Sequence, residues 1–406
     1  MSELKGAAYL KRKLAQKQPR INTRYAYYEM KHVARELGIA DTPETRWLKE
    51  TLGWCGNAVD CLADRLVFRE FRNDNFGLNE IFSMNNPDIL LDSAIQGALI
   101  SSCDFIYISE GEDGYPRMQV IDGGNATGTI DPITGLLREG YAVLERDSDT
   151  NLPTIEAYFL PKETYFYQNG EMYLKKEHKV EYPLLVPIIN RPDEKRPFGR
   201  SRISRACMSL QDAAVRTLKR SEITAEFYSF PQKYVTGLSQ DHEEMNRWKA
   251  TIASMLAFEK DENGEYPKLG QFSQASMEPH LTQLKIIASA FGGETGMTLD
   301  DLGFSTQNPS SAEAIKAAHE NLRLKARKAQ RSFGSGFLNA GYLAACLRDD
   351  YNYQRSQLYL TKPVWEPPFE ADASSLSGIG DAMNKLQQSF PEYITPELFG
   401  DLTGIH

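Results

Sequence analysis

The hydrophobic positions of the first hundred residues recur at helical spacing and predict three helices. The first covers residues 1–36. The second opens at Thr42-Pro43-Glu44, with Thr42 as N-cap and Pro43 at the first helical position, and runs towards Phe68. The third follows Asn86-Pro87-Asp88 and reaches about Ser102. The first helix carries a basic arm, which is either a solvated face or a partner contact: Lys11, Arg12, Lys13, Lys17, Arg20 and Arg24.

From Cys103 the pattern changes to short runs rich in aromatic and β-branched residues, which is typical of strands. The runs are FIYIS, RMQVID, YAVLER, TIEAYFL, TYFYQ and EMYLKKE. Turn residues separate them, and Asn169-Gly170 is a hairpin signal. We therefore predict one antiparallel meander over residues 103–180, with its edges covered by the flanking helices.

Residues 181–199 contain four prolines and are predicted to be extended. After Gly199 a long helix begins, and Pro231 ends it. One face of this helix is formed by Ile203, Cys207, Leu210, Ala214, Leu218 and Ala225. A compact α/β segment follows, with a strand near Tyr234, a helix after Asp241 and a hairpin around Asn263-Gly264.

A second helix is predicted from about Met277 to Phe291, where Gly292-Gly293 interrupts or ends it. Residues 299–309 form a loop. Ser310 and Glu313 then make a capping box that starts a long helix reaching about Leu347. A strand and turn follow within QLYLTKPVWEPP, and the tail 371–406 is predicted to hold two short polar helices. The fold class is therefore α+β.

Composition places this pattern in an ordinary globular protein of 406 residues. The net charge is −9, which disfavours a polybasic nucleic-acid-binding surface over the whole chain. Five widely spaced cysteines without CxxC spacing favour reduced thiols over a disulfide scaffold or a zinc ribbon. The N-terminus has no apolar stretch of signal-peptide length, and residues 89–108 are too polar to span a bilayer. We therefore expect a protein that is made or assembled in a cytoplasm, with no membrane partner.

The motifs of catalysis are missing from the sequence. It contains no GxxxxGK[ST], no GxGxxG after a strand and no GxSxG elbow. The six histidines lack metal-ligand spacing, and the paired carboxylates, such as Asp60 with Asp64, have no third ligand. Gly334-Ser335-Gly336 lies within the last long helix and predicts close helix packing. We expect no enzyme, catalytic residue, cofactor or metal.

Basic residues are concentrated on two of the predicted helices. The helix after Gly199 contributes Arg200, Arg202, Arg205, Arg216, Lys219 and Arg220, and the long helix after residue 310 contributes Lys316, Arg323, Lys325, Arg327, Lys328 and Arg331. Two interpretations stay open. These faces pair with acidic neighbours, or they lie where a polyanion or an acidic subunit passes.

The order of elements and three motifs resemble the portal proteins of tailed double-stranded DNA bacteriophages. The first motif is Pro197-Phe198-Gly199-Arg200-Ser201-Arg202-Ile203, which leads into the long helix. The second is Phe227–Gly237 (FYSFPQKYVTG), which resembles the passage into the family's clip. The most specific is Leu302-Gly303-Phe304 followed by Asn308-Pro309-Ser310-Ser311-Ala312-Glu313-Ala314-Ile315. The resemblance covers about residues 40–365.

The resemblance implies a ring of subunits, twelve in the virion, around an axial channel. It implies the following division of the chain: a wing of helices and β-meander (1–197), stem helix 1 (198–229), an α/β clip (230–276), stem helix 2 (277–298), a tunnel loop (299–309), the tunnel helix with a return to the wing (310–368), and a short helical crown-like C-terminal region (369–406). Two helices bracketing an α/β insert fit the stem and clip.

The resemblance also implies candidate sites. The DNA channel would be lined by Asp300, Asp301, Phe304, Ser305, Thr306, Gln307 and Asn308. The basic residues facing DNA or a neighbouring subunit would be Arg216, Lys219, Arg220, Lys316, Arg323 and Arg327. Clip contacts to partners would come from Glu243, Arg247, Lys260 and Asn263. An acidic lumen with few basic points would let a duplex slide, because each neutralised phosphate adds affinity.

The implied function is a structural portal subunit at one capsid vertex of the virion, for genome packaging and ejection. The implied partners are further copies of the chain, passing double-stranded DNA, the major capsid and scaffolding proteins, the terminase large subunit and the head–tail adaptor. Two other hypotheses remain at this point. One is another virion ring component, such as an adaptor or neck protein, and the other is an enzyme acting on nucleic acid.

Overall fold

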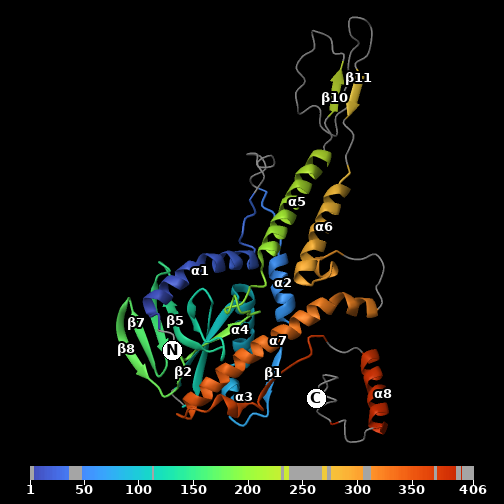
Figure 1. Cartoon of the computed structure of the whole chain (residues 1–406). Helices are drawn as coiled ribbons and strands as arrows, with labels where there is room; N and C mark the ends of the chain where they lie inside the picture. Colours follow the sequence, from blue (N-terminus) through green and yellow to red (C-terminus); the bar gives the residue numbers. More distant parts are fainter. Residues whose placement is uncertain are drawn as a thin grey trace. The chain divides into compact units, whose positions relative to one another are not determined.

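The computed structural model describes residues 4–35, 48–111, 114–229, 233–236, 268–271, 276–304, 312–369, 373–389 and 395. The chain divides into two compact units. Unit 1 comprises Met1–His32, Gly53–Met208 and Gly292–His406, and unit 2 comprises Val33–Leu52 and Ser209–Phe291. Figure 1 gives the element labels used below. Helices and antiparallel strands occur together in unit 1, which confirms the α+β class.

Unit 1 begins with helix α1 (Ala7–Tyr28), which packs on the larger sheet through Leu10 and Leu14. Its lysines bind that sheet directly. The Nζ of Lys11 forms an ion pair with Glu156 at 2.7 Å, and those of Lys13 and Lys17 each donate to a backbone carbonyl of the strand after residue 125 at 2.6 Å. These three lysines of the basic arm therefore bind strands of their own subunit.

The second predicted helix is shorter than the sequence pattern indicates. Helix α2 spans Trp54–Ala63, residues 48–53 are not helical, and residues 36–47 lie outside the description. Phe68 is not helical either, because it begins strand β1 (Phe68–Arg72), whose pairing with the distant strand β12 (Lys362–Trp365) draws this segment out of the helix. The prediction of one helix from 42 to 68 is wrong on these points. Helix α3 (Leu78–Ser83) follows, and α4 (Pro87–Ser101) confirms the third predicted helix.

The strands of residues 103–180 are present, but they form two sheets instead of one meander. A three-stranded sheet has the order β3-β2-β9, from Pro116–Ile121, Cys103–Glu110 and Leu185–Ile189. A five-stranded sheet has the order β4-β5-β6-β7-β8, from Ala126–Ile130, Leu137–Arg146, Pro153–Leu160, Glu163–Gln168 and Glu171–Glu177. Strand β2 pairs with β3 on one side and, on the other, with β9 from the proline-rich segment. Strand β4 begins the second sheet.

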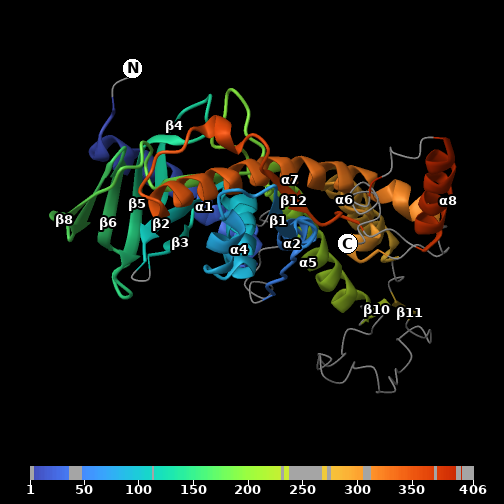
Figure 2. The same cartoon turned by 90° about the horizontal axis from the view of Figure 1, so that it is seen from below.

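Helices cover the smaller sheet, as expected: α4 and α7 (Ala312–Arg348) both contact β2, β3 and β9 (Figure 2). Asn169 and Gly170 have φ values of 50° and 88° at the β7–β8 turn, which confirms the predicted hairpin. Two glycines of α7 allow the close packing predicted for them. A Cβ at Gly334 would lie 2.7 Å from Pro363, and one at Gly336 would lie 2.9 Å from Ile188.

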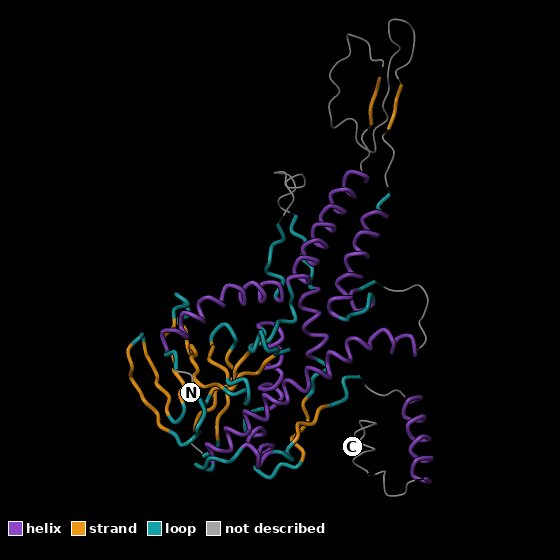
Figure 3. The backbone as a smooth tube through the Cα atoms, in the orientation of Figure 1, coloured by secondary structure: helices purple, strands orange, loops and turns teal. Residues whose placement is uncertain are grey.

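Unit 2 contains most of two helices and a strand pair (Figure 3). Helix α5 spans Arg205–Ser229 and α6 spans Glu278–Thr295. Between them in sequence, β10 (Lys233–Thr236) pairs with β11 (Lys268–Gln271). Helix α6 continues through Gly292 and Gly293, which corrects the predicted stop, and it ends where Gly296 adopts a φ of 82°. The helix after Asp241 and the turn at Asn263-Gly264 lie outside the described residues.

The remaining elements are the 3₁₀ helices η2 (Asp300–Leu302) and η3 (Arg355–Leu358) and helix α8 (Ala373–Ser389). The second helix predicted for the tail lies outside the described residues, as does the capping box. None of the five cysteines takes part in a disulfide bond, and four of them are buried. Within the described part of the chain, no helix is long and apolar enough to cross a membrane.

Candidate functional site

The described half of the predicted tunnel loop is an ordered turn in unit 1. Its centre is η2. Two hydrogen bonds between Thr298 and Asp301 hold this turn. The N–H of Thr298 donates to Oδ2 of Asp301 at 2.8 Å, and the N–H of Asp301 donates to Oγ1 of Thr298 at 3.2 Å. Gly303 then turns the chain with a φ of 88°. The predicted channel residues Ser305, Thr306, Gln307 and Asn308 lie outside the described residues.

This turn is held against α2 by contacts on both sides of η2. The side-chain amide of Asn57 donates to the carbonyl of Asp301 at 2.9 Å. Leu302 is buried, and Phe304 lies edge-on to Trp54 with 6.4 Å between the ring centroids. The start of the predicted channel segment is therefore positioned by unit 1 itself.

The two aspartates of this turn differ in their surroundings. Asp300 is exposed, whereas the Asp301 side chain is 19% exposed and lies 3.8 Å from Nδ1 of His319 on α7. Of the two carboxylates, only that of Asp300 is on the open surface of the single chain. This difference is invisible in the sequence, where the residues are adjacent.

The predicted basic residues of α5 are less exposed than a free helix face would be. Arg216 and Arg220 are half-buried, and Lys219 is only 4% exposed. Nη1 of Arg216 donates to the carbonyl of Arg35 at 3.4 Å. These three side chains are thus partly or almost fully buried in the single chain. A contact of theirs with DNA or with a neighbouring subunit stays a prediction.

The basic residues of α7 fall into different environments. Arg323 forms a two-point ion pair with Glu320, one turn earlier on the helix, at 2.7 and 2.9 Å. Arg327 is exposed and, with Arg331 and Trp365, lines a cavity of about 480 Å³. The side chain of Lys316 lies outside the description. The predicted clip contacts, which are Glu243, Arg247, Lys260 and Asn263, also fall outside the described residues.

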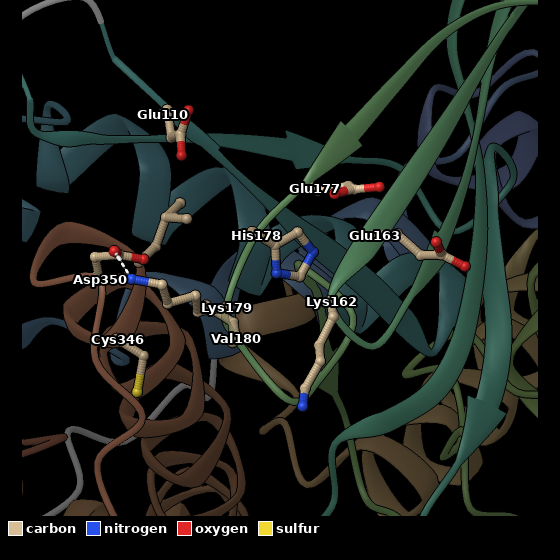
Figure 4. Close-up of a pocket in the computed structure, with 10 residues that line it drawn as sticks. Glu110, Lys162, Glu163, Glu177, His178, Lys179, Val180, Cys346 and Asp350 are labelled. Atoms are coloured by element: carbon tan, nitrogen blue, oxygen red, sulfur yellow. Dashed lines mark hydrogen bonds and ion pairs between the residues drawn. The ribbon is translucent and has the colours of Figure 1, made fainter.

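A cavity of about 440 Å³ lies beside the end of strand β8 (Figure 4). Acidic and basic side chains both line it, and Lys179 and Asp350 form an ion pair there. Burial lowers the pKa of His178 below its ordinary value of 6.5. Among the described residues no group of three or more His, Cys, Asp or Glu side chains is arranged to hold a metal ion.

A further cavity, which no motif of the sequence predicts, is lined mainly by basic side chains, and we call it the basic cavity. It measures about 200 Å³ in unit 1 and is lined by Leu62, Asn190, Arg191, Arg202, Leu324, Lys325, Lys328 and Ala329. The spacing of Lys325 and Lys328, one turn apart on α7, was the signal available in the sequence. The approach of residues 190–202 to α7 is a property of the tertiary structure.

Comparison with known proteins gives a consistent result. Residues 7–369 match the family model described as "Phage portal protein, SPP1 Gp6-like". The portal proteins of Mycobacterium phages D29 and L5 are 26% and 25% identical over 384 residues, which is 89% of this chain and 77% of each relative. A solved structure titled "Neck of native GTA particle computed with C12 symmetry" aligns with 87% of this chain and 91% of its own chain at 13% identity and a TM-score of 0.42. The family match extends from α1 through β12, and the chain therefore belongs to the SPP1 Gp6-like phage portal protein family.

Proposed function

We propose that this chain, a structural portal subunit, assembles with identical copies into a closed ring at one vertex of a phage capsid. Genomic DNA would enter and leave through the ring. The terminase motor and later the neck and tail would attach to it. The observation that carries the proposal is the family match over residues 7–369, which spans every described element from α1 to β12.

The arrangement of elements supports the division of the chain proposed for the ring. Helices α5 and α6 bracket the β10–β11 pair in sequence, as the two stem helices of the proposal bracket the clip. The 37-residue helix α7 follows the η2 turn, as the tunnel helix follows the tunnel loop. Residues 1–197 with the return through β12 correspond to the wing, and residues 369–406 to a short C-terminal region.

The charge of the chain favours a channel that does not bind DNA tightly. Each copy carries a net charge of −9, so a ring of twelve copies is strongly acidic. Repulsion between this ring and DNA phosphates opposes tight binding, and scattered basic residues set local contacts only. Where basic helices meet acidic neighbours between subunits, charge pairing would determine register and partner choice.

The direct test is to image the purified full-length chain by negative stain and then by cryo-electron microscopy. We expect closed rings with one central channel wide enough to admit duplex DNA. Ring assembly can be slow, so samples should be incubated and concentrated, with and without the scaffolding protein. A protein that stays monomeric by light scattering under all these conditions contradicts the proposal.

A second measurement separates this function from a nucleic-acid-processing enzyme. The sequence has no P-loop, and we expect the pure ring to hydrolyse no ATP and to leave supercoiled plasmid intact in the presence of Mg²⁺. Turnover that co-purifies with the ring and disappears on a point substitution in this chain would contradict this expectation. An adaptor or neck role is disfavoured by membership of the portal family.

A further inference from the structure

The basic cavity brings four cationic side chains from two segments of unit 1 to one small space. Arg191 and Arg202 come from the connection between β9 and α5, and Lys325 and Lys328 come from α7. Among the described residues, no acidic side chain lines the cavity. The carboxylate of Glu294 acts electrostatically on both Arg202 and Lys325, and it accepts a hydrogen bond from Ser204 at 2.9 Å.

Arg202 is the most enclosed of the four cations. Its side chain is 6% exposed, and its Nε donates to the carbonyl of Ala58 at 3.0 Å. Its Nη2 is buried and has no hydrogen-bond partner in the part of the chain that the structure describes. A buried guanidinium N–H without an acceptor is unfavourable, so an anion in the cavity would satisfy a donor that the protein leaves open.

The backbone fixes the connection that carries these arginines. Ser201 donates through Oγ to the carbonyl of Ile100 at 2.6 Å, and the N–H of Arg202 donates to the carbonyl of Leu99 at 2.7 Å. Both bonds anchor the chain to the last turn of α4. Arg191 adopts a φ of 50°, a strained conformation for a residue with a side chain, and such strain is concentrated at functional sites.

The two lysines differ in depth within the same cavity. The Nζ of Lys325 donates to the backbone carbonyl of Glu294 at 2.8 Å, while Lys328 is exposed. Burial, followed by the charges of Arg202 and Arg191, lowers the pKa of Lys325 to about 8. Burial is the largest cause of this shift, and a bound anion would offset the smaller part that comes from the two arginines.

We propose that the basic cavity binds one compact, multiply charged oxyanion of the phosphate type. Its volume of about 200 Å³ accommodates a tetrahedral oxyanion. Four cations with a single nearby carboxylate favour an anion of more than one charge over a lone carboxylate. The planar guanidinium of Arg202 would supply directional hydrogen bonds, and the two ammonium groups would supply point charges.

Two sources offer this chemistry, namely free phosphate and the backbone of DNA. A phosphodiester of duplex DNA carries sugars on both sides and would have to bring them to Arg202, which is only 6% exposed, whereas a free phosphate ion carries none. Free phosphate is therefore the favoured source. A bound phosphate would contact both the β9–α5 connection and α7. Because it would bind the folded state, it would stabilise unit 1 by mass action. This inference does not depend on ring formation.

The test is isothermal titration of inorganic phosphate into the full-length chain, at constant ionic strength set with chloride. We expect one phosphate per chain. Lys325→Gln should weaken binding by at least about tenfold, because it removes a half-buried ammonium group that would donate a charge-assisted hydrogen bond to the anion. Lys328→Gln should weaken it about threefold, as an exposed charge does. Arg331→Gln is the matched control, since it removes one exposed charge of α7 outside the cavity and should leave phosphate affinity unchanged.

A second arm distinguishes the sources with a blunt duplex oligonucleotide that has 5′-hydroxyl ends. If the duplex competes with phosphate and loses affinity in Lys325→Gln, the phosphate chemistry stands and DNA is its source. If only phosphate binding depends on Lys325, the free anion is the ligand. Absence of phosphate binding, or binding that Lys325→Gln and Lys328→Gln leave unchanged, overturns the proposal. Arg202→Lys keeps the charge and should still weaken binding, and a thermal melt confirms that it is folded.

Discussion

Thr298 and Asp301 cap each other across the first turn of η2, with hydrogen bonds of 2.8 and 3.2 Å between the backbone N–H of each and the side chain of the other. The adjacent Asp300 is exposed. Two neighbouring carboxylates therefore have different roles. The carboxylate of Asp301 holds the turn that precedes α7, and that of Asp300 lies on the surface of the single chain.

The first prediction follows from this cap. Asp301→Ala should lower the free energy of unfolding by about 1 kcal/mol, because the backbone N–H of Thr298 loses its carboxylate acceptor. Asp300→Ala should have a smaller effect. Urea unfolding of the two variants and the parent chain measures the difference. Equal effects of the two substitutions would show that the cap does not stabilise the turn.

The second prediction concerns charge in the proposed channel. Replacing both Asp300 and Asp301 with lysine should slow DNA movement through the ring, and more so at low salt, because the Debye length grows from about 10 Å at 0.1 M as salt is removed. Asp300→Lys alone separates the charge effect from loss of the cap. Packaging rates in a reconstituted head system provide the measurement. Wild-type rates for both variants at every salt concentration would place these residues away from DNA.

The third prediction concerns the length of the same segment. Shortening residues 303–308 should leave rings that assemble normally, since the bond from Asn57 to Asp301 and the burial of Leu302 hold the turn before it. Heads carrying such rings should be impaired in packaging or retaining DNA. Ring yield and the genome content of purified heads are the two readouts. Full heads at normal yield would contradict the proposed position of the loop in the channel.

The fourth prediction concerns the connection into α5. Gly199 has a φ of 70°, and a Cβ there would lie 2.1 Å from the carbonyl oxygen of Asn190. Gly170 has a φ of 88° with open space around it, so it is a matched control. Gly170→Ala should cost about 1–2 kcal/mol for its left-handed backbone. Gly199→Ala should cost more, because the chain must also move away from the carbonyl. Unfolding free energies of equal size would refute this steric account.

The fifth prediction uses the buried carboxyl group of Asp104 on β2. Burial, followed by the nearby charge of Asp122, raises the pKa of Asp104 above its ordinary value of 3.8. Oδ1 of Asp104 accepts hydrogen bonds from Ser101 at 2.8 Å and from the N–H of Gly123 at 2.9 Å. Between pH 3.8 and the raised pKa, the folded chain binds more protons at Asp104 than the unfolded chain does, so stability falls as pH rises.

Asp104→Asn should remove this dependence, because the amide resembles the neutral acid. Between pH 5 and 8, the parent chain should lose stability relative to the variant with a limiting slope of about 1.4 kcal/mol per pH unit. Asp147→Asn is the control. Hydrogen bonds from Thr150 lower the pKa of Asp147, so its titration lies below this window. Urea unfolding at several pH values measures the slopes, and parallel curves for the parent chain and Asp104→Asn would disprove the assignment.

Local patterns in the sequence determined many elements of this protein. Asn86-Pro87 lies at the start of α4, and Asn169-Gly170 forms the turn between β7 and β8. The helical periodicity after residue 310 predicts α7. Each signal lies within a few residues of the structure it specifies, because capping, turn conformation and amphipathic periodicity are local properties. The resemblance carried by the 302–315 motif likewise indicated the family that the comparisons confirm.

Only the tertiary structure decided which distant segments meet. Strand β9 takes the free edge of β2 and divides the expected meander into two sheets, and β1 pairs with β12 across nearly the whole chain. The same long-range packing buries Lys219 and Arg202 and leaves Asp300 exposed beside Asp301. Strand pairing and burial depend on which surfaces fit one another after the chain has folded, and residue type and spacing along the sequence do not contain that information.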